Sequence, residues 1–288
     1  MRCNGFMILI LALAAAPILP ASAETSNCTV ISSVPTTITT QGVYCLTGDL
    51  ATAVTTGAAI TINTNNVTID CNDRKLGGLA AGSGTQANGI YANTRLNIAV
   101  RNCNIRGFLH GIYLPGSGGG YHLIENNRFD LNTSYAIRTR GDGTTIRGNR
   151  VYDTGGSTVN PWAFGIDVQD NADIIDNAVA GVVATVGQGG GAYGIVTSGN
   201  DGGEVSRNRV SGLLHDGVGF NLGIWANGGR PVIRSNTIIG NTSMADSASA
   251  WGIRCNGDQP VALDNVVNYY GQYNSWTNCT LSSNLSNF

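Results

Sequence analysis

The stretch GIDVQDNADIIDNAVAG, residues 165–181, carries the pattern that decides the fold. Its apolar residues form short groups separated by polar ones, and aspartates stand at positions 167, 170, 173 and 176. No group follows a helical period, so the stretch predicts short strands joined by turns. The four aspartates then occupy different places on these strands and turns, and their roles must differ.

The pattern is one unit of a repeat. Gly-Ile recurs at 89, 111, 165, 194, 223 and 252, with Ala-Ile at 59 and 136, and the last four intervals are 29 residues each. An Asn-x-apolar motif follows from position 111 onward, at Asn127, Asn149, Asn177, Asn208, Asn236 and Asn265. An apolar residue stands three positions before each asparagine, at Ile124, Ile146, Ile174, Val205, Ile233 and Ala262. Each unit therefore contains three short apolar strands.

A unit of this length cannot bury its own apolar side, so the units must stack on one another. Three strands per coil, one on each wall, predict a parallel β-helix. A leucine-rich horseshoe would need an L-x-x-L-x-L spacing that is missing, and a β-sandwich would not keep a 29-residue period. We call the wall that begins at Gly-Ile the first wall, the wall before each repeated asparagine the second, and the wall after it the third.

With these Gly-Ile and asparagine repeats, the chain resembles the right-handed parallel β-helix superfamily, the pectate-lyase-like group with its asparagine ladder, over residues 58–270. The resemblance implies an all-β fold: a single right-handed parallel β-helix of seven to eight three-strand coils with capped ends. Its stacked asparagine amides bond from coil to coil. Such coils carry many functions, so the resemblance by itself implies no particular reaction.

The cysteines test the register of the repeat. Six follow residue 23, which predicts three disulfides and an oxidising compartment. Aligning NCNI, residues 102–105, with NNRF, residues 126–129, places Cys103 in the asparagine position, and Cys71 takes that place one coil earlier. Parallel strands lie about 4.8 Å apart, which a disulfide can span. The predicted pairs are Cys71–Cys103, Cys28–Cys45 in an N-terminal cap and Cys255–Cys279 at the tail.

The start of the chain predicts a signal peptide over residues 1–23. Arg2 precedes an apolar run at 6–19, which is too short to span a membrane, and Ala-Ser-Ala follows at 21–23. We therefore expect a secreted or periplasmic protein with an N-terminal cap at 24–57, the β-helix at 58–270 and a C-terminal tail at 271–288. No later apolar run reaches transmembrane length, so no membrane association is expected.

The charge balance bears on the partners. Without Arg2, 15 basic residues face 18 acidic ones, a net charge near −3. This balance argues against nucleic acid as the main partner, because nucleic acid favours a basic stripe. We expect a monomer that binds polysaccharide.

On the first wall, side chains alternate between the interior and the solvent. With the isoleucines inward, the predicted outward residues are Tyr91, Asn93, Tyr113, Pro115, Arg138, Arg140, Asp167, Gln169, Val196, Ser198, Trp225, Asn227, Arg254 and Asn256. Two arginines beside a carboxylate, flanked by aromatic rings, suit a groove for an acidic sugar chain. The alternative is an ordinary solvated face. The long glycine-rich connections at 154–164, 182–193, 213–222 and 241–251 favour the groove, since they would form its rim.

The other aspartates and His122 are predicted to lie outside the groove. Asp173 falls on the second wall and Asp176 beside the asparagine turn, so both are predicted to be structural. Asp170 lies in the turn after the first wall, as do Asp142 and Asp201, and aspartate is common in turns. We expect no cofactor, with calcium as the alternative, because stacked carboxylates can bind calcium. His122 is expected at the surface of the second wall.

Two further motifs are similar to motifs in enzymes of the superfamily. LHGIYLPGSGG, residues 109–119, is similar to the Gly-His-Gly region of polygalacturonase-type hydrolases. Those enzymes also carry Asn-Thr-Asp and Asp-Asp motifs, whereas this chain has Asn-Thr-Arg at 93–95 and no Asp-Asp pair. It therefore lacks the carboxylates that a hydrolase needs. GRPVIR, residues 229–234, is similar to the Arg-Pro-Arg motif of pectate lyases, but it falls on the second wall.

The functional hypothesis is a lyase or C5-epimerase acting on a uronate polysaccharide. Arg138 or Arg140 would neutralise the substrate carboxylate, and Asp167 would orient an arginine or hold a calcium ion. His110, Tyr113 or the other arginine would remove the C5 proton. The residues predicted to bind the rest of the substrate are Gln169, Trp225, Asn227 and Arg254. The alternative is a non-catalytic extracellular glycan-binding or surface structural protein.

Overall fold

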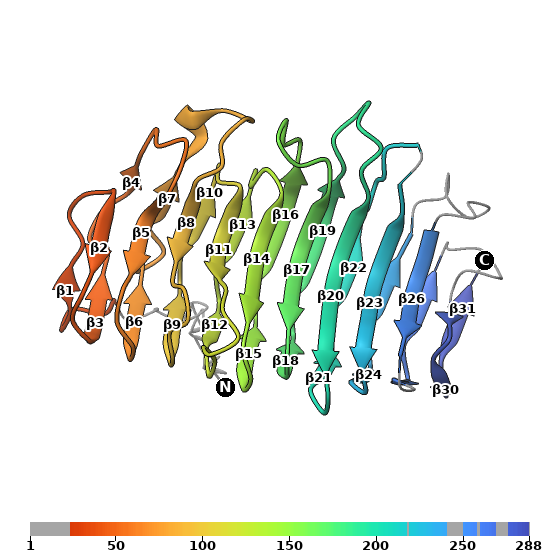
Figure 1. Ribbon diagram of the computed structural model, residues 1–288. Helices are drawn as coiled ribbons and strands as arrows, with labels where there is room; N and C mark the ends of the chain where they lie inside the picture. The colour runs from red at the N-terminus through yellow and green to blue at the C-terminus, as the bar shows by residue number, and fades with distance from the viewer. Residues whose placement is uncertain (1–23, 218, 241–249, 258–259, 269–275, 288) are drawn as a thin grey trace, which may run out of the picture.

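The computed structural model describes residues 24–217, 219–240, 250–257, 260–268 and 276–287. Over these residues the chain winds into an elongated solenoid whose strands lie side by side in three parallel sheets (Figure 1). The one helical element described is the 3-10 turn η1 (Leu79–Ala81). The predicted all-β parallel β-helix is therefore confirmed. The predicted signal peptide, residues 1–23, lies outside the described residues.

From β2 onward the strands of the three walls follow one another in strict rotation. The first wall consists of β2 (Thr36–Ile38), β5 (Ala58–Ile62), β8 (Asn88–Tyr91), β11 (His110–Leu114), β14 (Tyr135–Arg140), β17 (Ala163–Gln169), β20 (Ala192–Asn200), β23 (Asn221–Gly229), β26 (Ala250–Asn256) and β29 (Trp276–Thr277). The second wall consists of β1 (Thr29–Val30), β3 (Gly42–Cys45), β6 (Val67–Asp70), β9 (Ile98–Arg101), β12 (Leu123–Glu125), β15 (Thr144–Arg147), β18 (Ala172–Ile175), β21 (Glu204–Ser206), β24 (Val232–Arg234), β27 (Val261–Leu263) and β30 (Thr280–Ser282). The third wall consists of β4 (Leu50–Ala51), β7 (Lys75–Gly77), β10 (Asn104–Arg106), β13 (Arg128–Asp130), β16 (Arg150–Gly155), β19 (Ala178–Val183), β22 (Arg209–Ser211), β25 (Thr237–Ile239), β28 (Val266–Asn268) and β31 (Leu285–Asn287).

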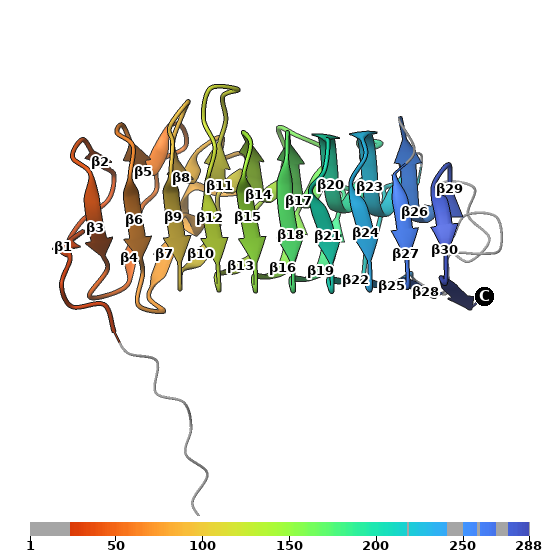
Figure 2. The ribbon, with the colours of Figure 1, turned by 90° about the horizontal axis from the view of Figure 1, so that it is seen from below.

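The coils are stacked in one continuous column, as the turned view shows (Figure 2). Among the described residues, eight three-strand coils run from β5 to β28, which agrees with the predicted seven to eight. Strands β2, β3 and β4, from the expected N-terminal cap, pair in the same three sheets. So do β29, β30 and β31, from the expected tail. The boundaries assigned to cap and tail stay a prediction.

The interior is built from columns of apolar side chains, one from each wall. The first-wall column is fully buried and consists of Ile60, Ile90, Ile112, Ile137, Ile166, Ile195, Ile224 and Ile253. Burying such a side chain contributes about 1.5–3 kcal/mol relative to leaving it exposed. The repeated isoleucine therefore supplies the driving force that stacks one coil on the next.

Steric crowding explains why a glycine precedes the repeated isoleucine. A Cβ added at Gly111 would lie 2.6 Å from the carbonyl oxygen of Ala136 and 2.8 Å from Cδ1 of Phe129, which is buried in the interior. Gly111 and Ile112 thus both face inward, which breaks strict alternation at this point. Because of this break, the residue before the glycine faces outward, and a similar arrangement recurs from coil to coil.

The predicted asparagine ladder is present at the turn between the second and third walls. Each Nδ2 donates to the Oδ1 of the next asparagine at 2.9–3.0 Å, through Asn127, Asn149, Asn177, Asn208, Asn236, Asn265 and Asn284. All of these residues except Asn284 are buried. In several turns the preceding residue has a positive φ, such as 57° at Asp176. This conformation turns the asparagine inward, where buried amides need partners.

All three predicted disulfides form: Cys28–Cys45, Cys71–Cys103 and Cys255–Cys279. Cys71 and Cys103 occupy the asparagine position one coil apart, with their Cα atoms 4.7 Å apart. The backbone N–H of Cys103 donates to Oδ1 of Asn127, so the ladder continues directly from this disulfide. The register deduced from the repeat is confirmed.

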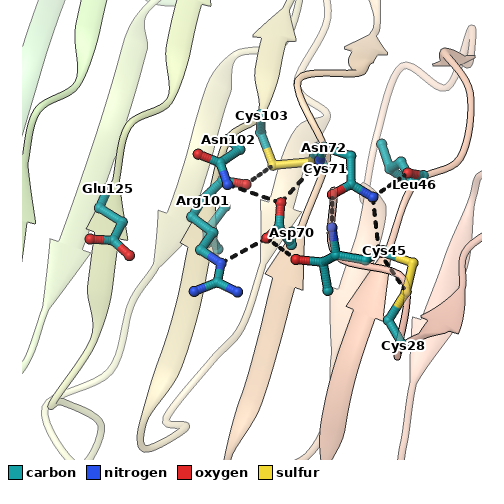
Figure 3. A network of polar contacts seen from close by, with 12 residues as sticks. Cys28, Cys45, Leu46, Asp70, Cys71, Asn72, Arg101, Asn102, Cys103 and Glu125 are labelled. Atoms are coloured by element: carbon teal, nitrogen blue, oxygen red, sulfur yellow. Dashed lines mark hydrogen bonds and ion pairs between the residues drawn. A yellow bond between two sulfur atoms is a disulfide. The ribbon is translucent and has the colours of Figure 1, made fainter. Parts of the chain in front are cut away.

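Asp70 holds a polar network beside the first two disulfides (Figure 3). Its carboxylate is 2% exposed and accepts hydrogen bonds from the Thr25 hydroxyl, the Asn72 backbone N–H, the Asn102 amide and Nε of Arg101. Burial opposes ionisation of Asp70, but these donors together lower its pKa below the usual value. The network ties residues near the start of the described chain to two successive coils.

Replacing Asp70 by asparagine is expected to lower the free energy of unfolding at pH 7 by about 3 kcal/mol. The asparagine amide would place an N–H group opposite donors that now bind the carboxylate, so at least one of these hydrogen bonds would be lost. A carboxylate with a lowered folded-state pKa stabilises the fold above its unfolded value, near 3.8, and that contribution is lost as the pH falls further. Denaturant titration should therefore show a difference in the free energy of unfolding between the wild-type protein and Asp70→Asn that is smaller at pH 3 than at pH 7. The control is Asp49→Asn, at an exposed carboxylate; an equal loss there would contradict the role of Asp70.

Candidate functional site

The outward face of the first wall carries the predicted charge cluster. β14 and β17 pair in the expected register, with Arg138 beside Asp167 and Arg140 beside Gln169. Nε of Arg138 lies 3.1 Å from Oδ2 of Asp167. Arg140 extends further out, and its Nε lies 3.4 Å from Oδ2 of Asp170.

Asp167 is an unusual carboxylate. It is only 6% exposed although it lies on the outer face, where it is flanked in register by Arg138 of one coil and Val196 of the next. Burial raises the pKa of Asp167 to about 6, and the nearby Arg138 guanidinium acts in the opposite direction. The attraction of Arg138 therefore offsets only part of the free-energy cost of burying the Asp167 charge.

A column of rings runs along the same face. The residues before the repeated Gly or Ala face outward, and the rings of His110, Tyr135, Phe164 and Tyr193 stack at centroid distances of 4.4–4.8 Å. The stack follows the solenoid axis, so neighbouring rings cover one another's faces. Tyr135 is 7% and Tyr193 4% exposed. The column thus forms a rigid apolar floor and shows mainly its ring edges to the solvent.

His110 is held in one orientation. Its ring lies between Tyr113, at 4.4 Å, and Tyr135, at 4.8 Å. Its Nδ1 lies 2.8 Å from Oδ1 of Asn88, and Nδ2 of Asn88 donates to the carbonyl of Gly57 at 2.9 Å. Since the amide N–H groups turn toward Gly57, Oδ1 faces the histidine and must accept a hydrogen bond from Nδ1–H. This hydrogen-bond chain assigns the lone pair to Nε2.

The charge state of His110 follows from its surroundings. Burial lowers the pKa of His110 to about 3, and the positive charge of Arg138 adds to the effect. The imidazole is therefore neutral throughout the physiological pH range. A neutral ring with a defined lone pair can accept a proton but has none to give from Nε2.

A hollow of about 210 Å³ opens beside the arginines, lined by Tyr113, Pro115, Gly116, Arg138, Thr139, Arg140 and Gln169. The guanidinium carbon of Arg138 lies 4.9 Å from the Tyr135 ring and 5.7 Å from the Tyr113 ring. These contacts hold Arg138 against the floor of the site. The structure thus brings Arg138, Arg140, Tyr113 and Gln169 together around one cavity, with His110 stacked on Tyr113.

The remaining predicted binding residues lie further along the wall. Trp225 pairs in register with Arg254, and Asn227 with Asn256, two and three coils beyond Asp167. Here Tyr193, Val196 and Leu222 form an outer apolar cluster against which Phe164, Trp225 and Trp251 pack. The guanidinium of Arg254 lies 4.7 Å from the Trp251 ring. This half of the wall is therefore largely covered by its own side chains.

The other aspartates of the opening stretch take part in local contacts. Asp173 accepts a hydrogen bond from the backbone of Glu204, and Asp176 forms an ion pair with Arg207 at 2.8 Å. Asp170 pairs with Arg140. Across the described part of the chain, no three His, Cys, Asp or Glu side chains gather as a metal site would require. Calcium at the Asp142, Asp170 and Asp201 turns stays untested.

Sequence reasoning missed two features of the site. It counted a strict alternation and so did not place the ring column, and it did not consider Asn88. Phe164 and Tyr193, which the sequence predicts in the connections, lie in β17 and β20. The available clue was the aromatic or histidine residue directly before the repeated Gly or Ala, at 110, 135, 164, 193 and 251. His122, expected at the surface, is 3% exposed, and its Nδ1 accepts the backbone N–H of Ile98.

The chain matches a known protein family and is similar to a solved structure. The family model described as right handed beta helix region matches residues 88–287, more than half of the chain. No curated protein sequence matches. Among solved structures, the A-module of mannuronan C-5 epimerase AlgE6 from Azotobacter vinelandii is similar at 12% identity and a TM-score of 0.38, over 85% of this chain and 81% of that one. A likeness of that degree carries no argument about activity. None of the described helical residues forms a segment long and apolar enough to cross a membrane.

Proposed function

We propose, for a chain that belongs to the right-handed β-helix family, that the first wall binds an acidic polysaccharide and acts on its uronate residues as a lyase or C5-epimerase. The observation that carries the proposal is the ion pair between buried Asp167 and partly exposed Arg138, beside the open hollow. A carboxylate whose pKa is raised by burial costs stability at neutral pH, and such groups concentrate at functional sites. The ligand class follows from the two arginines, whose forked guanidinium groups suit carboxylates.

The chemistry requires one proton to leave C5 of a uronate. Arg140, which is exposed, and Arg138 would bind the substrate carboxylate and so stabilise the negative charge that develops on it. Nε2 of His110, or the oxygen of Tyr113 in its deprotonated phenolate form, would accept the C5 proton. In an epimerase a proton then returns to C5 from the opposite face. In a lyase the electron pair forms a C4–C5 double bond, and the O4 glycosidic bond breaks as its oxygen takes up a proton.

Asp167 would act through Arg138 as a positioning residue. Above about pH 6 its carboxylate is charged and orients the guanidinium; below that pH the charge is lost. Gln169 is in register with Arg140 and is placed to bind substrate hydroxyl groups. Trp225, Asn227 and Arg254 would extend the binding face toward β26.

A non-catalytic glycan-binding protein is the second candidate. Two observations favour it: the apolar cluster that covers the β20–β26 part of the wall, and the pKa near 3 of His110, which makes it a weak base. Three disulfides suit secretion or the periplasm under either candidate. A monomer remains the expected state.

The candidates are separated by incubation with alginate, polygalacturonate and glycosaminoglycans in D2O. Unsaturated product, seen by ultraviolet absorbance, indicates a lyase. Deuterium at C5 without chain cleavage, seen by NMR, indicates an epimerase. Binding with neither result would establish the non-catalytic alternative, and absence of binding would reject the proposal.

Arg140→Ala is expected to leave thermal stability almost unchanged, because its ion pair with Asp170 is exposed. It should weaken polyuronate binding by about 1.5–3 kcal/mol through loss of a charge-assisted hydrogen bond. Isothermal titration measures the affinity. The control is Arg147→Ala on the second wall, which removes another exposed arginine that forms an ion pair. A fall in melting temperature with unchanged binding would make Arg140 structural.

A further inference from the structure

The third wall carries arginines that differ from those of the second wall. On the second wall, Arg101, Arg147 and Arg234 each have a carboxylate partner within 3 Å, at Asp70, Glu125 and Glu204. On the third wall, Arg128, Arg150 and Arg209 are exposed, and within the described ranges none of them forms an ion pair. These three third-wall arginines therefore lack the carboxylate partners that the second-wall arginines have, whereas Arg106 of the third wall pairs with Asp130 at 2.8 Å.

Two of these arginines are direct neighbours. Arg128 of β13 and Arg150 of β16 are paired in register, so their Cα atoms are about one strand spacing, roughly 4.8 Å, apart. Like charges directly opposite each other on a sheet are unfavourable. A negatively charged ligand that bridges both side chains removes this repulsion.

The surroundings of this pair form a hollow of about 490 Å³. Tyr152, 42% exposed, lies beside Asp130 on the same surface, and Asn104 flanks Arg128 in the preceding coil. An exposed aromatic ring suits the face of a sugar. Amide and carboxylate groups suit its hydroxyl groups. We name the surface of Asn104, Arg128, Asp130, Arg150 and Tyr152 the third-wall surface.

We propose that the third-wall surface is a second binding site for an acidic polysaccharide, which lies across β10, β13 and β16 with a carboxylate between Arg128 and Arg150. Carboxylates at Asp49, Asp73 and Asp130 also line the hollow. They repel a densely charged polyphosphate but accept hydrogen bonds from sugar hydroxyls, so a polyuronate fits better than a nucleic acid. The inference rests on the proposed function for its ligand class. It adds a site on a different wall, which would hold a long polymer close to the first wall.

The test compares two double variants that remove the same charge. Arg128→Ala/Arg150→Ala empties the third-wall surface, whereas Arg147→Ala/Arg207→Ala removes two exposed arginines elsewhere. Binding to immobilised polygalacturonate, alginate and hyaluronan is measured at constant ionic strength, with methyl-esterified pectin as the uncharged comparison. We expect the first variant to lose about tenfold or more in affinity for a polyuronate and the second to lose far less. Equal melting temperatures exclude unfolding as the cause.

Several outcomes would overturn the proposal: equal losses in both variants, equal binding of the methyl-esterified polymer, or wild-type protein that binds single-stranded DNA but no polyuronate. Failure of the proposed function is a different result. It would appear as absence of turnover together with unchanged binding in Arg140→Ala. If the wild-type protein shows no turnover but Arg128→Ala/Arg150→Ala still weakens polymer binding, the proposed function fails and the third-wall site is upheld.

Discussion

Replacing His110 by glutamine is expected to lower kcat on a uronate polymer at least about a hundredfold, the lower end of what a positioned base contributes. The neutral imidazole presents its lone pair at Nε2, whereas an amide nitrogen at that place is not a base. Glutamine is preferred to alanine because alanine would also open a gap in the ring column between Tyr113 and Tyr135. An unchanged kcat would remove His110 from the mechanism and leave Tyr113 as the base.

Asn88 provides a readout that does not depend on turnover. In the wild-type protein, the 15N resonances of the His110 ring should show a protonated Nδ1 and a bare Nε2 down to about pH 4, because the pKa lies near 3. Asn88→Leu removes the acceptor and should allow both neutral tautomers. Asn88→Asp keeps an acceptor and adds a negative charge, so it should preserve the tautomer and raise the pKa of His110. The same tautomer in all three proteins would show that Asn88 does not set it.

Replacing Asp167 by asparagine is expected to stabilise the folded protein at pH 7.5 while reducing its activity. The pKa of Asp167 rises from 3.8 in the unfolded chain to about 6 in the fold. A shift of that size corresponds to about 3 kcal/mol between the two protonation states, which sets the upper limit of the gain. Asparagine has nearly the same shape and avoids burying a charge. The lost contact with Arg138 reduces the gain but should not reverse it.

The pH dependence of stability follows from the direction of this shift. A carboxyl group with a raised folded-state pKa binds its proton more tightly in the fold than in the unfolded chain. Its contribution to stability is therefore largest below about pH 3.8 and is lost as the pH rises to about 6. Denaturant titration between pH 4 and pH 7 should show this loss in the wild-type protein and not in Asp167→Asn.

Activity should change in the opposite direction over the same range. If ionised Asp167 orients Arg138, kcat rises as the pH passes about 6, and Asp167→Asn loses this step. Asp173→Asn, at an exposed carboxylate on the second wall, is the control for both measurements. A variant less stable than the wild type at pH 7.5, with unchanged activity, would mean that the Arg138–Asp167 pair serves the fold alone.

The sequence by itself determined the coil, the ladder, the three disulfides and the neighbours across the first wall. The reason is periodicity: residues one repeat apart occupy adjacent parallel strands, so Arg138 and Asp167, 29 positions apart, had to meet once the repeat was recognised. The cysteine pair at 71 and 103 follows from the same register. The functional roles of these residues stay predictions.

The tertiary structure alone decided the outer ring column, the tautomer of His110 and the raised pKa of Asp167. Alternation along a strand could not place Tyr135 or Phe164, because the crowded interior forces Gly111 and its counterparts inward together with the following isoleucine. The tautomer depends on atoms from three different coils. His110 bonds to Asn88, 22 residues away in the chain, and Asn88 bonds to Gly57, 31 residues away. Burial of Asp167 likewise arises from the side chains that neighbouring coils stack around it, and a repeat pattern does not contain that information.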